Sequence, residues 1–348
     1  NMGKYIEIAG RKIGQDYDPV IIAEIGINHE GKLDVAKAMV DAAYNCGIEI
    51  IKHQTHILEE ELTPLAKQMK MSNKSDTNLY EMLEKICLSE KEEQKLKKYV
   101  ESKGMIFISA PFSFAAVDRL ERMDIKAYKV SSAVMNNYPL LEYVASKKKP
   151  IILSTGMNDI ESVRKAVKTI EKYHSNYALL HCTNIYPTPA DKIRLNAMKE
   201  LKETFPNSVI GLSDHSLNNY SSYAALALGA SIIERHFIDD KRRKGHDVEW
   251  SMTPEEAKEL VNYAKVIRKM EIGSKKPLDE EKEMIEMTFN TVVAKRLIRK
   301  DSTITKDDLT TKGPNKFGIP AEDLYKVVWK KATRDIQENE HLQWEDIK

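Results

Sequence analysis

Short apolar runs alternate with amphipathic stretches along most of the chain. Continuous apolar runs bounded by turn signals are typical of strands buried on both faces of a parallel sheet. The expected strands are 20–25, 48–53, 105–110, 127–132, 150–155, 177–183, 209–213 and 231–236. Apolar residues at helical spacing predict helices at 33–46, 79–103, 113–123, 138–147, 160–173, 195–204, 219–228 and 254–269. The alternation predicts an α/β fold.

Strand–helix pairs repeated eight times over about 250 residues predict a (β/α)₈ TIM barrel. An open doubly wound sheet is the alternative, and its first strand usually leads into a glycine-rich phosphate turn. The turn at 25–31 lacks that dinucleotide pattern, which favours the barrel. A short hairpin at 5–14 precedes the first strand and is expected to plug or flank the barrel.

The pattern changes after residue 272. A charged stretch at 275–287 with Pro277 indicates a linker. Beyond it, β-like runs lie at 292–294, 297–298, 327–329 and 332–336. We therefore expect a barrel domain with its hairpin at 1–272, a linker at 273–290 and a small β-rich domain at 291–348. A domain of about 60 residues is marginally stable alone and is expected to lean on another surface.

Polar residues occur where the expected strands stop. In a barrel these carboxyl ends form one face, and active sites lie there. Unpaired charges are costly to bury, so their gathering on one rim indicates a ligand site. The rim residues are Glu24, Lys52, Gln54, Lys129, Ser132, Ser154, Asn184, Tyr186, Ser213, His215 and His236.

Two of these residues, His215 and His236, end consecutive strands. The helix at 219–228 joins the two strands into a βαβ unit, which sets them side by side. Neutral imidazole is a common metal ligand, so the pair could share one divalent ion. Two unrelated histidines packed near the surface are the alternative interpretation.

The other rim residues suggest anion binding and proton transfer. Lys52 and Lys129 supply charge, and nearby hydroxyl and amide groups supply fixed donors, as a phosphate site requires. Alternatively, each lysine pairs with a neighbouring carboxylate. Glu24 is a candidate acid or base. A metal, a phosphate cradle and a proton donor together fit condensation of a phosphorylated enol with a carbonyl. They also fit aldolase or isomerase chemistry.

Composition excludes several other classes of protein. The chain has 54 Lys and Arg against 53 Asp and Glu, a formal charge of +1, which gives no footprint for nucleic acid or an anionic membrane. No apolar run approaches the ~18 residues of a membrane span. Three cysteines without paired spacing suit a reducing compartment, and residues 1–4 do not resemble a secretory signal. We expect a cytoplasmic protein.

Several segments resemble the sialic acid (N-acetylneuraminate) synthase family, and the resemblance covers nearly the whole chain. They are IAEIGINHEG at 22–31, KHQT at 52–55, HCTNIYPTP at 181–189, GLSDH at 211–215 and ERHF at 234–237. The tail, with KATRDI at 331–336, resembles the antifreeze-like (SAF) domain of that family. The resemblance implies an enzyme that condenses phosphoenolpyruvate with an N-acetylated hexosamine aldehyde, usually N-acetylmannosamine. Its products would be a nine-carbon α-keto acid and phosphate, released by C–O cleavage.

The resemblance also implies roles for single residues. His215 and His236 would bind Mn²⁺, with Mg²⁺ or Co²⁺ as alternatives, and Glu24 would handle a proton. Phosphoenolpyruvate would be held by Lys52, Asn73, Lys129, Ser132, Ser154, Asn184 and Ser213. The sugar would meet Gln54, Tyr186 and Asp247. Family members are homodimers in which the tail of one subunit covers the barrel mouth of the other, so a domain-swapped homodimer is expected.

Three positions depart from the family pattern. Residues 131–134 read SSAV where a Gly-Ser-Gly-Glu-like run is common, and Val134 cannot accept a hydrogen bond. Ala110 stands where a hydroxyl residue is frequent. Gly313 replaces an arginine before proline, and the neighbouring Lys312 cannot copy a bidentate guanidinium. These changes predict an acceptor other than plain N-acetylmannosamine, such as a diacetamido-trideoxyhexose of legionaminic or pseudaminic acid synthesis, or an unacylated sugar.

Two other functions remain open from the sequence. A metal-dependent sugar-phosphate aldolase or isomerase on the same barrel would turn over without phosphoenolpyruvate. A catalytically silent sugar-binding paralogue would bind a sugar without releasing phosphate.

Overall fold

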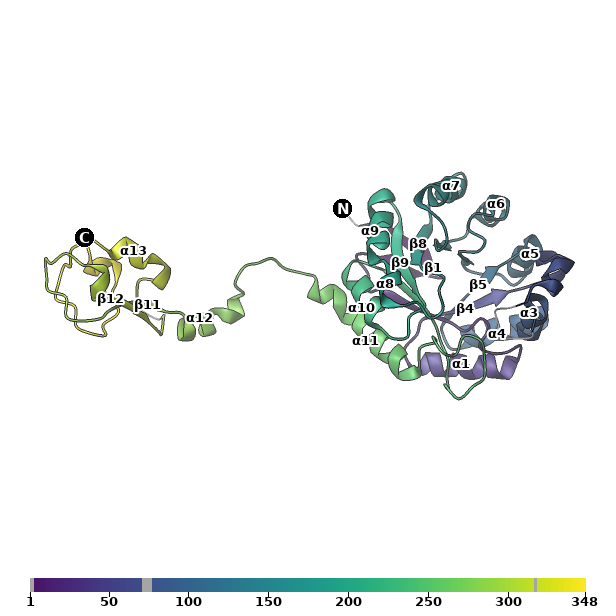
Figure 1. Ribbon diagram of the computed structural model, residues 1–348, viewed down its shortest axis with the longest axis horizontal. Helices are drawn as coiled ribbons and strands as arrows, with labels where there is room; N and C mark the ends of the chain where they lie inside the picture. The colour runs from purple at the N-terminus through teal and green to yellow at the C-terminus, as the bar shows by residue number, and fades with distance from the viewer. Residues whose placement is uncertain (1–2, 71–76, 316–317) are drawn as a thin grey trace. The chain divides into compact units, whose positions relative to one another are not determined.

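A computed structural model describes residues 3–70, 77–315 and 318–348 (Figure 1). The chain divides into two compact units, Asn1–Ile272 and Gly273–Lys348. The first holds the barrel and the second holds the small C-terminal fold. No helix in the described ranges is long and apolar enough to cross a membrane.

The first unit is a closed parallel barrel in which neighbouring strands follow chain order, except where β10 closes onto β3 (Figure 1). This confirms the (β/α)₈ prediction and excludes the open sheet. The strands are β3 (Val20–Glu24), β4 (Ile50–Thr55), β5 (Ile106–Pro111), β6 (Tyr128–Val130), β7 (Ile151–Ser154), β8 (Tyr177–Cys182), β9 (Val209–Asp214) and β10 (Ile232–His236).

Helices cover the outside of the barrel, and most begin near the predicted residue. They are α1 (Leu33–Asn45), α3 (Leu79–Ile86), α4 (Glu90–Ser102), α5 (Phe114–Arg122), α6 (Tyr138–Ser146), α7 (Ile160–Glu171), α9 (Leu195–Thr204), α10 (Tyr220–Ala227) and α11 (Pro254–Met270). Thr253 caps α11 in a capping box, and a proline occupies the first turn. Loop elements that were not predicted are α2 (Leu58–Glu61), α8 (Ala190–Ile193) and the 3₁₀ turn η1 (Pro64–Gln68).

The single helix predicted over 79–103 is wrong, because the chain breaks between α3 and α4. Ser89 accepts a hydrogen bond from the Glu92 backbone N–H, and the Glu92 side chain accepts one from the Ser89 backbone. This capping box satisfies the free N–H groups of a new helix start, so it favours two helices over one.

The N-terminal hairpin seals one end of the barrel. It consists of β1 (Tyr5–Ile8) and β2 (Arg11–Gly14), and it plugs the barrel as one of the two predicted arrangements. Its isoleucines pack in one cluster with residues from the first halves of the strands. The cluster contains Ile6, Ile8, Ile13, Val20, Ile22, Ile50, Ile108, Ala127, Ile152, Ala178, Leu180, Val209 and Ile232. Because this end is apolar and closed, polar side chains in the barrel interior can gather only at the other end.

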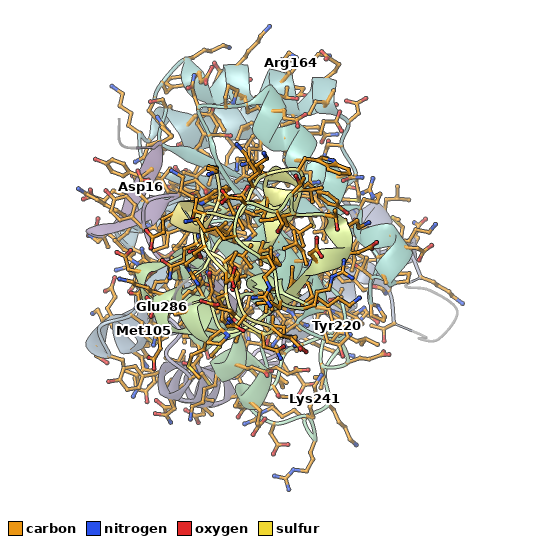
Figure 2. All side chains as sticks on the ribbon, turned by 90° about the vertical axis from the view of Figure 1, so that its left-hand side faces the viewer. Asp16, Met105, Arg164, Tyr220, Lys241 and Glu286 are labelled. Atoms are coloured by element: carbon orange, nitrogen blue, oxygen red, sulfur yellow. The ribbon has the colours of Figure 1, made fainter. Side chains whose placement is uncertain are left out.

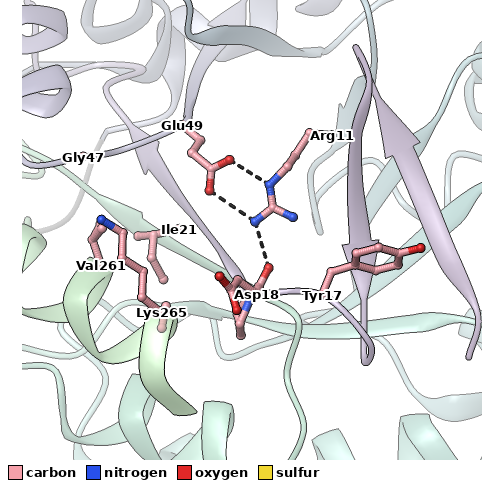
Figure 3. Close-up of a pocket in the computed structure, with 10 residues that line it drawn as sticks. Arg11, Tyr17, Asp18, Ile21, Gly47, Glu49, Val261 and Lys265 are labelled. Atoms are coloured by element: carbon pink, nitrogen blue, oxygen red, sulfur yellow. Dashed lines mark hydrogen bonds and ion pairs between the residues drawn. The ribbon is translucent and has the colours of Figure 1, made fainter. Parts of the chain in front are cut away.

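A hollow of about 370 Å³ lies beside the plugged end (Figure 3). Arg11 spans it and is already paired: its guanidinium contacts the Glu49 carboxylate at 2.7 and 3.2 Å and donates to the Asp18 carbonyl at 2.8 Å. With its arginine satisfied, this hollow is better explained as part of the hairpin's attachment than as a ligand site.

The second unit is small and irregular. Strands β11 (Thr291–Ala294) and β12 (Leu309–Lys312) pair antiparallel, and the unit also contains short helices. The α-helices are α12 (Lys282–Thr288) and α13 (Leu324–Val327), and the 3₁₀ helices are η2 (Asp279–Glu281), η3 (Lys306–Asp308), η4 (Ala321–Asp323) and η5 (Trp344–Asp346). Its core is Val292, Ala294, Ile298, Ile304, Leu309, Ile319, Val327, Ala332, Ile336, Leu342 and Ile347.

Several details of this unit differ from the sequence expectations. The prediction of a β-like run at 327–329 is wrong, since Val327 ends α13. Strand β12 was not predicted. The runs at 297–298 and 332–336 meet only through isolated bridges, such as Ile298 with Ile336. The stretch expected as a linker contains η2 and α12. Apolar residues here reach a shared core from turns, so strand-like composition overstates the number of strands.

Candidate active site

A pocket of about 400 Å³ opens at the carboxyl ends of the barrel strands. It brings together most residues proposed from the sequence: Lys52, Gln54, Lys129, Ser132, Ser154, Asn184, Tyr186, Ser213, His215, His236 and Asp247. Glu24 is fully buried next to Lys52 and Gln54. Asn73 lies outside the described residues.

Alternation along the strands explains why these side chains converge. Residues two apart share a face, so Lys52 with Gln54, and Glu234 with His236, all face the pocket. The register sets Glu24 opposite both Lys52 on β4 and His236 on β10. It also sets Glu234 opposite Ser213 on β9. The polar positions therefore form one layer across several strands.

The base of the pocket is a buried cluster of charges. Lys52 Nζ lies 2.6 Å from Glu24 Oε2 and 3.2 Å from Glu234 Oε1, and Lys129 Nζ lies 3.5 Å from Glu234 Oε1. Burial lowers the pKa of Lys129, and the attraction of Glu234 only partly offsets this. Burial would also lower the pKa of Lys52, but Glu234 and Glu24 outweigh it and raise that pKa. Burial would raise the pKa of Glu234, but the two lysines lower it to about 2.

The lysines do pair with carboxylates, which was the alternative to a phosphate site. This pairing still leaves some polar groups without a hydrogen-bond partner. Among the described residues, Ser154 Oγ and Glu234 Oε2 are buried without a hydrogen-bond partner. Buried polar atoms normally have hydrogen-bond partners, so the missing partners need an explanation. Two lysines and the free Ser154 hydroxyl around one space are what an anionic ligand requires.

Glu24 is held at both oxygens. Oε1 accepts hydrogen bonds from Gln54 Nε2 and from the Gly26 backbone N–H, each at 2.9 Å, while Oε2 faces Lys52. A Cβ atom on residue 26 would lie 1.9 Å from Oε1, so only glycine permits this close approach. The carboxylate therefore has one fixed position beside the pocket.

His215 and His236 stand side by side, with ring centroids 5.4 Å apart. His215 Nδ1 lies 3.0 Å from the Thr183 carbonyl, and His236 Nδ1 lies 3.2 Å from Asp247 Oδ2. Histidines that bind metals through Nε2 usually have a carbonyl or carboxylate beside Nδ1. Burial would lower the pKa of His236, but Asp247 and Glu24 raise it above its ordinary value.

The residues present fit an open metal site. Within the described ranges, no group of three or more His, Cys, Asp or Glu side chains could enclose an ion. Two imidazoles would supply two ligands to a divalent ion and would leave its other coordination positions open to substrate and water.

Other residues that line the pocket were not proposed as site residues. They are Ile27, Met82, Leu83, Phe112, Ser131, Ala133, Cys182, Glu234, His246 and Trp250. Glu234 could have been included from its spacing of two from His236, whereas apolar residues in a sequence look like core. Val134, in contrast, is half-buried against the barrel core and does not line the pocket.

Outward-facing residues at the same strand ends hold the loops. His53 Nδ1 lies 3.0 Å from Glu93 Oε1 on α4. Asp214 accepts hydrogen bonds from Ser221 and Ser222, both at 2.6 Å, which ties β9 to α10 beside His215. Hydrogen bonds to the outer helices therefore hold the loops that carry the site.

Comparisons with known proteins identify the family of the chain. A model of the NeuB family matches residues 39–276, and a model of the SAF domain matches residues 289–348. An uncharacterised protein of Methanocaldococcus jannaschii is 39% identical over 98% of both chains. The N,N'-diacetyllegionaminic acid synthase of Campylobacter jejuni is 35% identical over 92% of this chain and 98% of its own. The crystal structure of an N-acetylneuraminic acid synthetase from Leptospira borgpetersenii covers 82% of this chain and 96% of its own, at 31% identity and TM-score 0.72.

Proposed function

The chain belongs to the NeuB family of nonulosonic acid synthases and carries a SAF domain C-terminal to its barrel in sequence. We propose that it joins phosphoenolpyruvate to an open-chain acylamino sugar. The observation that carries the proposal is the buried cluster of Glu24, Lys52, Lys129 and Glu234 beside the paired histidines. It combines an anion site, a proton carrier and a place for a Lewis acid within one pocket.

The lysines and hydroxyls would bind the phosphate and carboxylate of phosphoenolpyruvate. Lys52 and Lys129 are buried, so their charge acts in a low dielectric and attracts an anion strongly. Ser154, whose Oγ has no partner among the described residues, would donate to it. Ser132, Asn184 and Ser213 line the same pocket and would complete the cradle.

Mn²⁺ is the proposed cofactor, with Mg²⁺ or Co²⁺ as substitutes, and His215 and His236 would hold it. Bound there, the ion would polarise the carbonyl of the sugar aldehyde. Gln54, Tyr186 and Asp247 line the pocket near these histidines and would orient the acceptor.

The reaction balances without a further reactant. Carbon C3 of phosphoenolpyruvate attacks the aldehyde carbon, and water adds to C2. The resulting tetrahedral carbon then loses phosphate by C–O cleavage, leaving the α-keto acid. Glu24, fixed by Gln54, Gly26 and Lys52, would accept the proton of the water and pass it to a developing alkoxide or to phosphate.

We further propose that the preferred acceptor is a diacetamido-trideoxyhexose. Ile27, Met82, Leu83 and Phe112 give the pocket an apolar lining, which suits a methyl-ended sugar better than a hydroxymethyl group. The 35% identity to a legionaminic acid synthase supports the same choice.

A panel of acceptors tests both proposals through phosphate release from phosphoenolpyruvate. We expect kcat/KM for 2,4-diacetamido-2,4,6-trideoxymannose to exceed that for N-acetylmannosamine by about 10- to 100-fold. This is the usual discrimination when an apolar pocket binds a methyl group in place of a hydroxymethyl group. N-acetylmannosamine as the best substrate would contradict the acceptor proposal alone. Turnover of a sugar phosphate without phosphoenolpyruvate would instead support the aldolase or isomerase, and sugar binding without turnover would support a silent paralogue.

We propose that the protein is a homodimer that exchanges its SAF domains. The second unit has a small core and exposes Met284, Met287, Phe289, Tyr325, Trp329 and Trp344. An apolar surface on so small a unit is typical of one buried by a partner. Sedimentation at micromolar concentration should give about twice the mass of 39.8 kDa, and removal of residues 273–348 should give a monomer. A full-length monomer at the concentration of the activity assay would contradict the exchange.

A further inference from the structure

The indole of Trp250 has a buried donor with no partner. Trp250 lines the pocket with only 6% of its surface exposed, and its Nε1 meets no hydrogen-bond acceptor among the described residues. An indole N–H can only donate, and leaving such a donor unpaired inside a protein is energetically unfavourable. We therefore expect a bound ligand to supply the hydrogen-bond acceptor for this N–H.

The position of the ring indicates which substrate supplies that acceptor. The indole centroid lies 5.4 Å from the Tyr186 ring, which lies 4.4 Å from the His215 ring. The indole also meets the exposed His246, with 5.9 Å between centroids. Aromatic contacts thus connect His215 to Trp250 and on to an exposed residue. If the aldehyde is held at the histidines, the rest of the acceptor chain lies along these rings.

The loop that carries Trp250 is well anchored. Lys241, labelled in Figure 2, donates from Nζ to the carbonyls of Val248 and Glu249 at 2.8 and 2.9 Å. Ser251 Oγ donates to the Asp247 carbonyl at 2.6 Å. These bonds flank residue 250 on both sides in sequence, so the indole is presented by a rigid loop, as a specificity contact requires.

We propose that Trp250 is a specificity-determining residue for the acceptor. Its N–H donates a hydrogen bond to an oxygen of the acceptor chain beyond the aldehyde, either a hydroxyl or an acyl carbonyl, and its ring packs against the C–H groups of the sugar. The inference rests on the proposed condensation and names a residue that would recognise the amino sugar and not phosphoenolpyruvate. A site built to hydrogen-bond a substrate oxygen discriminates strongly against analogues that lack it.

Trp250→Phe tests the inference by removing the N–H and keeping an aromatic ring. We expect the KM for the acceptor to rise about 10-fold, the equivalent of one hydrogen bond, while the KM for phosphoenolpyruvate stays within about 2-fold. Tyr99→Phe is the matched control, because it removes one hydrogen-bond donor, the hydroxyl bonded to Asp41 at 2.6 Å, on the outer helix α4. An unchanged acceptor KM in Trp250→Phe, or an equal rise in both KM values, would overturn the inference.

A binding measurement separates failure of the inference from failure of the proposed function. The chain has three tryptophans, so the emission of the unmodified protein minus that of Trp250→Phe reports on Trp250 with the other two left in place. Reduced open-chain N-acetylmannosamine has no aldehyde and cannot react, and its addition should change the indole emission to saturation. If no acceptor is turned over but the emission still saturates, the function fails and the contact stands. If turnover is normal and the emission does not respond, the contact fails and the function stands.

Discussion

Replacement of His215 by alanine is expected to lower kcat by about 10³-fold and to remove the dependence of the remaining rate on Mn²⁺. The factor corresponds to about 4 kcal/mol, a usual contribution of a metal that polarises a carbonyl. His215 and His236 are the two proposed ligands, so loss of His215 leaves His236 alone, and the ion would bind weakly. Steady-state rates with and without Mn²⁺, together with calorimetric titration of Mn²⁺, measure both effects.

The control for this variant is His174→Ala. His174 is a half-buried histidine just before β8, and it accepts a hydrogen bond from the Asn176 backbone far from the strand ends that form the pocket. It should keep both its rate and its Mn²⁺ affinity. His215→Ala protein that binds Mn²⁺ as tightly as the unmodified protein would remove His215 from the metal site.

Glu24→Gln is expected to lower kcat by about 10³-fold while the KM for phosphoenolpyruvate changes little. A positioned acid or base contributes about 10²- to 10⁴-fold, and an amide of the same shape cannot take up a proton. The amide oxygen can still accept from Gln54 and Gly26, while its NH2 group would face Lys52. Glu234 still balances the charge of Lys52, so phosphoenolpyruvate binding should persist. Single-turnover phosphate release separates loss of chemistry from loss of binding.

Glu49→Gln is the matched control, because it changes an ion-paired carboxylate at the plugged end of the same barrel (Figure 3). It should leave kcat unchanged. A Glu24→Gln enzyme with a rate within about 10-fold of the unmodified protein would show that another group carries the proton.

Much of the barrel and its polar layer could be predicted from the sequence because both follow from alternation. A buried strand fixes which residues face inward, so Lys52 and Gln54 had to share a face, and βαβ pairing placed His215 beside His236. The break before α4 had a readable signal, a serine followed three residues later by glutamate. In that case helical periodicity on both sides concealed the break.

The rest of the pocket could not be predicted because it depends on which apolar residues the fold leaves uncovered. Phe112 and Trp250 come from loops, where no strand period fixes their direction, and in a sequence they resemble core residues. Val134 shows the converse: its departure from the family motif was expected to change the acceptor site, yet it packs on the core. Tertiary packing decides such positions.

The most direct test of the proposed condensation is phosphate release from phosphoenolpyruvate in the presence of Mn²⁺, followed with and without an acylamino sugar. We expect release to require both substrates, to match the α-keto acid formed one for one, and to be lost in His215→Ala. Phosphate released without any sugar, or no release with any member of the acceptor panel, would contradict it.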